Sequence, residues 1–163
     1  MQQQLTIGTL LHCAYKIERI LGQGSFGITY LGTHLALNKK VAIKEFFMKG
    51  LNTREADASV TEMEEGSLQY NYAQKFKKEA LNLALLDHPN IVRVTDSFEE
   101  NGTFYYVMDY IEGQNLNDYI KSNFISEAEA IDIISCRCSH LYARDASHAS
   151  LGFEARQCNE TNK

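Results

Sequence analysis

The chain has 163 residues, of which 44% are hydrophobic, so it can bury the core of one domain or of part of one. Its 21 acidic residues outnumber its 16 lysines and arginines, and the formal net charge of -5 argues against a protein that binds nucleic acid by neutralising phosphates. The opening residues show no basic region followed by a long apolar run, so we expect no signal peptide, no membrane partner and a cytoplasmic location.

A glycine-rich turn follows the first predicted strand. Residues 15–20 have the apolar content of a strand, and Gly22, Gly24 and Gly27 form a G-x-G-x-x-G pattern before strand character resumes at 28–31. Glycine at these places lets the backbone bend tightly and approach a phosphate with no side chain in the way. We therefore expect a hairpin that covers a ligand.

A single lysine lies in the next predicted strand, residues 41–47. Alternation along a strand places Val41 and Ile43 on one face and Ala42 and Lys44 on the other. A small residue and a cation on one face suit a flat ring that carries phosphates.

Residues 49–67 are polar and acidic without clear periodicity, which predicts a solvated, partly disordered insertion. From 73 to 87 the period becomes helical, with an apolar stripe formed by Phe76, Ala80, Leu83 and Ala84. Glu79 falls on the edge of this stripe. We expect its carboxylate to need a cationic partner, for which Lys44 is the candidate; the alternative is a boundary glutamate that reaches into water.

The rest of the pattern favours two more strands and two short helices. His88 and Pro89 stop the helix, and two β-rich runs, 91–98 and 103–110, are joined through the favoured hairpin turn Asn101-Gly102. Residues 116–120 suit a short helix, and a further helix begins at the S-x-x-E capping box of residues 126–129.

In this order the motifs resemble the amino-terminal lobe of a Ser/Thr-type protein kinase of the bacterial type, over residues 15–134. LGQGSFG resembles the glycine-rich loop, with Thr29 where valine is usual, and VAIK matches the third-strand lysine motif. FKKEALNLALLDHPNIV resembles the helix with the paired glutamate, and YYVMDYIEGQNL the gatekeeper and hinge. A dinucleotide-binding fold would place a helix directly after the glycines, where a β-type run follows. The resemblance implies an α+β fold, with an antiparallel five-stranded sheet, one main helix and the start of the second lobe.

The resemblance also implies a site for ATP. Lys44 would hold the α- and β-phosphates and be oriented by Glu79, while the backbones of Asp109 and Ile111 would bond the adenine edge. Leu21, Ala42 and the gatekeeper Met108 would enclose the ring, and Tyr105 and Tyr106 are interpreted as sheet aromatics. The expected ATP-binding residues are Leu21, Gly22, Gln23, Gly24, Ser25, Phe26, Gly27, Ala42, Lys44, Glu79, Met108, Asp109 and Ile111.

Phosphoryl transfer requires an H-R-D-x-x-x-x-N motif and a D-F-G motif, which supply the residue that orients the acceptor hydroxyl and the ligands of magnesium. Neither motif occurs in the 163 residues, and Arg144-Asp145 lacks the expected neighbours. We therefore assign no catalytic and no metal-binding residue, although Mg²⁺ is expected for the complete family. The expectation is a truncated, inactive chain that binds ATP and a protein substrate or partner.

Residues 135–163 differ in kind from the rest, because apolar periodicity fades and three of the four cysteines lie there. We interpret all four as free thiols, since Cys136 and Cys138 lack the spacing of a zinc site. Residues 150–159 can be encoded so that reading one base later spells HLDLKPGN, which has the form of a kinase catalytic loop. The predicted organisation is an extension (1–14), a kinase portion (15–134) and a tail (135–163) that is out of frame or natural.

Two alternatives to an ATP-binding lobe remain open. One is a non-catalytic module in which the lobe and the acidic insertion bind a partner protein, and the other is a split enzyme whose second lobe comes from another chain. Nucleotide affinity that depends on Lys44 separates the first alternative from the kinase interpretation.

Overall fold

The computed structural model describes residues 3–61, 63–88, 91–113 and 116–131. They fall into two compact units, one that ends at Tyr110 and one that begins at Ile111. The predicted tail, 135–163, lies outside the described residues, as do Pro89 and Arg144-Asp145.

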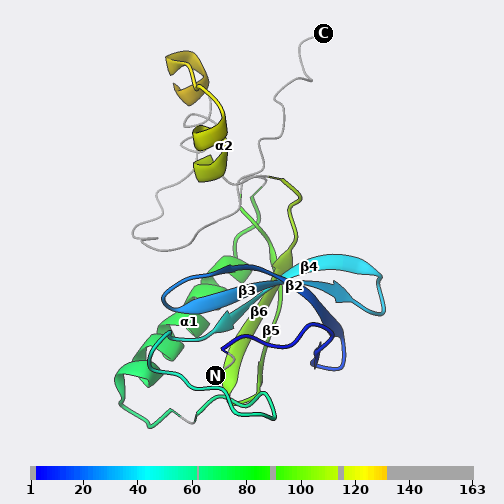
Figure 1. The fold of residues 1–163 in the computed structure, drawn as a ribbon, viewed down its shortest axis with the longest axis vertical. Helices are drawn as coiled ribbons and strands as arrows, with labels where there is room; N and C mark the ends of the chain where they lie inside the picture. Colours follow the sequence, from blue (N-terminus) through cyan, green and yellow to red (C-terminus); the bar gives the residue numbers. More distant parts are fainter. Residues whose placement is uncertain (1–2, 62, 89–90, 114–115, 132–163) are drawn as a thin grey trace. The chain divides into compact units, whose positions relative to one another are not determined.

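The first unit is built on an antiparallel six-stranded sheet, drawn from blue to light green in Figure 1. The spatial order of the strands is β1-β2-β3-β4-β6-β5, so β4 lies between β3 and β6. The strands are β1 (Leu10–Leu11), β2 (Tyr15–Gln23), β3 (Gly27–His34), β4 (Lys39–Phe46), β5 (Val94–Glu100) and β6 (Thr103–Asp109). The predicted antiparallel α+β fold is confirmed.

The sheet has one strand more than the five expected. Leu10 and Leu11 pair with Lys16 and Tyr15, and the turn between them is made by His12 and Cys13, both with φ of 50°. A strand of this length cannot display an alternating pattern, and neither residue of the turn is a glycine. The sequence therefore offered no signal for it.

The hairpin between β5 and β6 turns where the sequence predicted. Asn101 has φ of 53° and Gly102 has φ of 69°, the pair of positive values that a type I′ turn requires. A Cβ on Gly102 would also lie 2.8 Å from the carbonyl oxygen of Val60. Glycine is thus required there both by the backbone angle and by the close approach of the segment before α1.

The main helix, α1 (Leu68–Ala84), begins before the predicted residue 73. Ser67 caps its first turn by accepting a hydrogen bond from the Tyr70 amide at 3.1 Å. None of the residues of this first turn is buried, so it shows no apolar stripe and was missed by a search for apolar periodicity.

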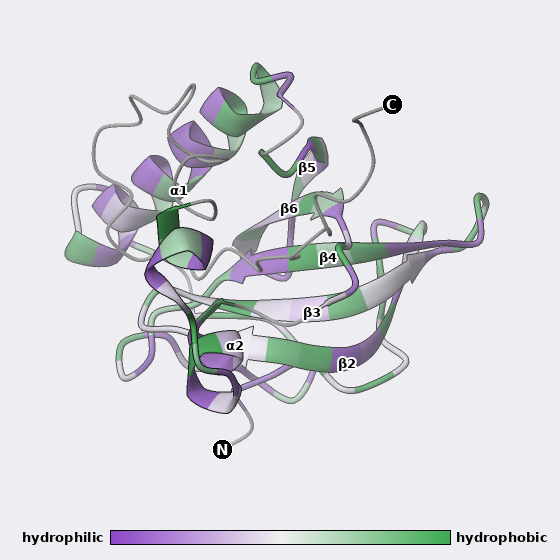
Figure 2. Ribbon diagram, turned by 90° about the horizontal axis from the view of Figure 1, so that it is seen from above, coloured by the Kyte–Doolittle hydropathy of each residue, from purple (hydrophilic) through white to green (hydrophobic). Residues whose placement is uncertain are grey.

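The helix buries Ala73, Phe76 and Ala80 against the sheet, and Leu83 packs there in part. Figure 2 shows hydrophilic and hydrophobic residues alternating along its turns, as expected of a helix with one buried side. Ala84 is exposed, so its assignment to the apolar stripe was wrong. The helix ends at this residue, with Leu85 as its C-cap, before His88 is reached.

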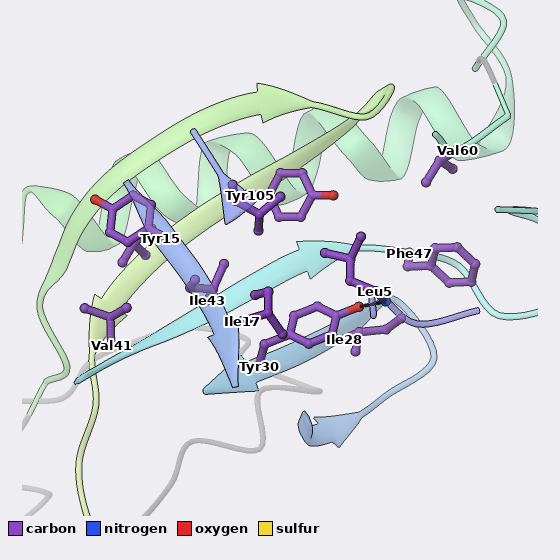
Figure 3. Close-up of a cluster of buried hydrophobic side chains, with 12 residues drawn as sticks. Leu5, Tyr15, Ile17, Ile28, Tyr30, Val41, Ile43, Phe47, Val60 and Tyr105 are labelled. Atoms are coloured by element: carbon purple, nitrogen blue, oxygen red, sulfur yellow. Dashed lines mark hydrogen bonds between the residues drawn. The ribbon is translucent and has the colours of Figure 1, made fainter. Parts of the chain in front are cut away.

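The two faces of the sheet carry separate cores. On the helix face, α1 packs against Phe46, Met48, Val94 and Tyr106. On the opposite face, residues near the amino terminus and around residue 60 cover the sheet, and Figure 3 shows Leu5 directed at Tyr30 and Val60 beside Phe47. The Leu5 amide donates to the Tyr30 hydroxyl at 3.1 Å. The extension and the insertion are therefore parts of the fold.

The prediction of a solvated insertion at 49–67 was wrong for its middle part. Asn52, Arg54 and Val60 are buried, and the Asn52 side chain accepts a hydrogen bond from the Met48 amide at 2.7 Å. Arg54 also forms an isolated β-bridge with Val60. Buried residues at irregular spacing leave no periodic signal, so composition alone suggested a solvated loop.

The second unit contains α2 (Leu116–Ser122), as predicted, and helical residues at 127–131. Ser126 Oγ accepts from the Glu129 amide at 3.2 Å, which is one half of the predicted capping box. The Glu129 carboxylate instead accepts from the Tyr119 hydroxyl at 2.9 Å.

Candidate functional site

The glycine-rich turn joins β2 to β3 as a tight hairpin. Gln23 is paired with Ile28, and the Gly24 amide donates to the Gly27 carbonyl at 2.8 Å. A Cβ on Gly22 would have no neighbour within 4 Å, and one on Gly24 only an ordinary contact at 3.9 Å. A Cβ on Gly27 would lie 2.7 Å from the Glu45 carbonyl oxygen. Gly27 is therefore required by packing on β4, whereas the space over Gly22 and Gly24 is open.

The residues between these glycines have different surroundings. Leu21, Gln23 and Ser25 are exposed. Phe26 is half-buried and stacks on Tyr72 of α1, with ring centroids 4.8 Å apart. The Ser25 and Phe26 carbonyls accept hydrogen bonds from the amides of residues 49 and 47. The turn is thus anchored to the end of β4 and to the helix.

Lys44 of β4 and Glu79 of α1 form an ion pair on the helix face, with Nζ 3.2 Å from Oε1. The lysine side chain is 20% exposed and the glutamate 45%, so the pair lies at the edge of the buried core. A Cβ on Gly27 would be 3.7 Å from Lys44 Cε, so the turn lies directly against the lysine. The glycine turn, the lysine and the glutamate thus converge from three elements.

Tyr106 of β6 joins the ion pair, which the sequence interpretation as a sheet aromatic missed. It lies opposite Lys44 in the β4–β6 register, and its hydroxyl donates to Glu79 Oε1 at 3.2 Å. Burial, followed by the negative charge of Glu79, raises the pKa of the Tyr106 phenol well above its usual range. The phenol therefore remains a hydrogen-bond donor at neutral pH.

The residues expected to hold a ring lie on the adjoining stretch of the same two strands. Ala42 is buried and lies opposite Met108 in the register. The Asp109 amide donates to the Arg93 carbonyl at 3.1 Å, and the Asp109 carboxylate accepts from Lys39 at 2.6 Å. Ile111 is the first residue of the second unit.

A second group of charged and hydroxyl side chains lies on the opposite face; we call Tyr30, Glu45, Arg54 and Tyr105 the buried network. The Glu45 carboxylate is fully buried and accepts from Arg54 at 2.6 Å and from the Tyr30 and Tyr105 hydroxyls at 2.7 Å each. Burial, and after it the charge of Glu45, raises the pKa of both phenols above the usual range. Strand alternation already places Glu45 with Val41 and Ile43, and this was the signal that could have indicated a buried carboxylate.

Among the described residues, no three histidine, cysteine or acidic side chains gather in a group that could hold a metal ion. The described residues therefore contain no protein-only metal cluster, and no chemical step is derived through Mg²⁺. Within the same ranges, no helix is both long and apolar enough to cross a membrane.

Comparison with known proteins identifies the family of this chain. Residues 15–148 match the family model of the protein kinase domain. The chain is 32% identical over 131 residues to the serine/threonine-protein kinase PrkC of Bacillus subtilis and 33% identical over 143 residues to the human serine/threonine-protein kinase Nek5. These alignments cover 80% and 84% of this chain but 18% of each relative.

Solved structures agree with this assignment. The apo form of PpkA-294 superposes with a TM-score of 0.69 at 29% identity, over 83% of this chain and 47% of that one. The PknI kinase domain of Mycobacterium tuberculosis gives a TM-score of 0.60 at 22% identity, over 82% and 48% of the two chains, and supports the fold alone. The chain thus spans about half the length of these kinase structures. It belongs to the protein kinase domain family, with serine/threonine kinases among its relatives.

Proposed function

We propose that this chain is the ATP-binding portion of a Ser/Thr protein kinase. The observation that carries the proposal is the Lys44–Glu79 ion pair beside the glycine turn. The Lys44 ammonium group is oriented by a carboxylate, and its side chain is 20% exposed. It is therefore accessible to the phosphates of a nucleotide and can bind them without a rearrangement of the core.

The glycine turn supports the same proposal. Neither Gly22 nor Gly24 has a positive φ, and a Cβ on either would meet no close atom of the protein. The fold itself therefore does not demand glycine at these two positions. A phosphate that approaches the backbone would demand it, because a side chain would occupy the same space.

We further propose that the 163 residues transfer no phosphate by themselves. ATP brings Mg²⁺, which neutralises the charge of the β- and γ-phosphates when it is bound, but the sequence has neither the D-F-G motif nor the catalytic-loop asparagine that would hold it. Lys44 and Glu79 can orient a nucleotide, whereas the sequence has no H-R-D motif to orient an acceptor hydroxyl.

Calorimetric titration with ATP tests the proposal. Replacing Lys44 by methionine removes a charge-assisted hydrogen bond worth about 1.5–3 kcal/mol, so we expect ATP affinity to fall about 10- to 150-fold. Lys40→Met is the matched control, since Lys40 lies on the same strand as Lys44 but is exposed and pairs with Glu18 of β2. Undetectable binding, or binding that Lys44→Met leaves intact, would favour the interaction module instead.

A further inference from the structure

The ion pair of the nucleotide site has a third member. Tyr106 is 2% exposed, and its hydroxyl donates to Glu79 Oε1 at 3.2 Å. The same oxygen accepts from Lys44 Nζ, also at 3.2 Å, and Nζ lies 5.3 Å from the centre of the Tyr106 ring. One phenol therefore contacts both the carboxylate and the ammonium group.

The tyrosine is held more firmly than the carboxylate to which it donates. Its ring lies 5.0 Å from that of Phe76, which in turn lies 5.5 Å from that of Phe46, so three aromatic rings from β6, α1 and β4 fix its position. Glu79, by contrast, is 45% exposed. An ion pair whose carboxylate is this exposed contributes little by itself and does not fix the position of the carboxylate.

This difference gives the hydroxyl a defined task. A buried phenol requires an acceptor, and Glu79 is the acceptor that it has. The bond ties the carboxylate to the sheet independently of Lys44. When the ammonium group turns toward a phosphate, Glu79 therefore keeps its position, and the lysine keeps a fixed anionic partner.

We propose that Tyr106 is a positioning residue for nucleotide phosphates: it fixes Glu79, and through Glu79 it orients the Lys44 ammonium group. The inference rests on the proposed ATP-binding function and adds a residue to it. Tyr106 is not a catalytic residue, since it touches the ion pair and not a reacting atom. The raised pKa of its phenol agrees with this role, because the donor stays protonated.

The neighbouring residue provides a matched control. Tyr105 is equally buried and its hydroxyl also donates to a carboxylate, that of Glu45 at 2.7 Å, but on the opposite face of the sheet. Tyr105→Phe and Tyr106→Phe each remove one buried hydroxyl that is bonded to a carboxylate. Only the second change touches the Lys44–Glu79 pair.

The first measurement compares ATP with adenosine by calorimetry. In Tyr106→Phe we expect ATP affinity to fall about five- to tenfold and adenosine affinity to change less than twofold, because the effect acts through the phosphates. In a chain that already carries Glu79→Ala, Tyr106→Phe should lower ATP affinity no further. Tyr105→Phe should leave the ratio of the two affinities unchanged. Equal losses for ATP and adenosine would mean a purely structural role and would overturn the inference, as would unchanged ATP affinity.

A second measurement does not require nucleotide. Urea unfolding of Tyr106→Phe, Glu79→Ala and the double variant should reveal a coupling of about fivefold in the unfolding equilibrium constant, because alanine, unlike glutamine, leaves the phenol without its acceptor; the cycle of Glu79→Ala with Tyr105→Phe should reveal none. If the unmodified chain binds ATP but Tyr106 and Glu79 show no coupling, the inference about Tyr106 fails while the proposed function stands. If the unmodified chain binds no ATP, the proposed function fails and the phosphate role of Tyr106 fails with it, whereas coupling would still assign to the tyrosine the positioning of Glu79.

Discussion

Replacing Arg54 by methionine tests how the buried network holds the fold together. The Arg54 side chain is 3% exposed and that of Glu45 is fully buried. The guanidinium group donates to Glu45 Oε1 at 2.6 Å, to the Gln3 carbonyl at 3.0 Å and to the Ala58 carbonyl at 2.7 Å. A single side chain thus joins β4, the amino-terminal segment and the insertion.

The expected loss is large because the change leaves a charge behind. Removing one partner of a buried ion pair typically costs about 3–5 kcal/mol, since the other charge stays desolvated. The Tyr30 and Tyr105 hydroxyls still donate to the carboxylate, which favours the lower part of that range. With a urea m-value of about 2 kcal/mol per molar, the lower part of the range lowers the midpoint by about 1.5–2 M.

Urea unfolding at pH 7, followed by circular dichroism, measures this loss. Lys40→Met breaks the exposed pair with Glu18 and should cost about 0–1 kcal/mol. Adding Glu45→Gln to Arg54→Met should recover part of the stability, since glutamine still accepts from the tyrosines but carries no charge. A loss no larger than that of Lys40→Met would refute the reasoning, and so would a double variant that is less stable than Arg54→Met.

Three further predictions concern stability and the gene. Stability should fall above about pH 10, because burial raises the pKa of Tyr15 to about 12 and holds those of Tyr30, Tyr105 and Tyr106 higher still. Above this pH the unfolded state loses phenol protons that the folded state keeps, so the free energy of unfolding falls by about 1.4 kcal/mol per pH unit for each such tyrosine. Urea unfolding at pH 8, 10 and 11 measures this slope, and a stability that does not change with pH would contradict the prediction. Gly102→Ala should lower the free energy of unfolding by about 1–3 kcal/mol, because Gly102 has a positive φ and a Cβ there would collide with the Val60 carbonyl oxygen. The loss should exceed that of Gly50→Ala, since Gly50 also has a positive φ but open space around it. Equal losses in urea unfolding would exclude the Val60 contact as a cause. Sequencing the gene should reveal codons for residues 150–159 that spell HLDLKPGN one base later, and any other codons would sink the frameshift interpretation.

Local patterns in the sequence determined much of this architecture. The glycine turn, the strand that carries Lys44 and the Asn101-Gly102 hairpin were predictable because turn chemistry and strand alternation act between near neighbours. The pairing of Lys44 with Glu79 followed from one further step, that a carboxylate on the buried edge of a helix needs a cation. The kinase resemblance depended on the same short motifs in order.

Only the tertiary structure determined which side chains contact Lys44 and Glu45 on the two faces of β4. Lys44 and Glu45 are consecutive and point to opposite faces, but their partners Tyr106, Arg54 and Tyr105 come from distant segments. No local pattern specifies that an irregular insertion will bring an arginine back to a buried carboxylate, because such a contact depends on packing and desolvation rather than on periodicity. For the same reason the sequence indicated a sheet aromatic at Tyr106, and only the fold placed its hydroxyl on Glu79.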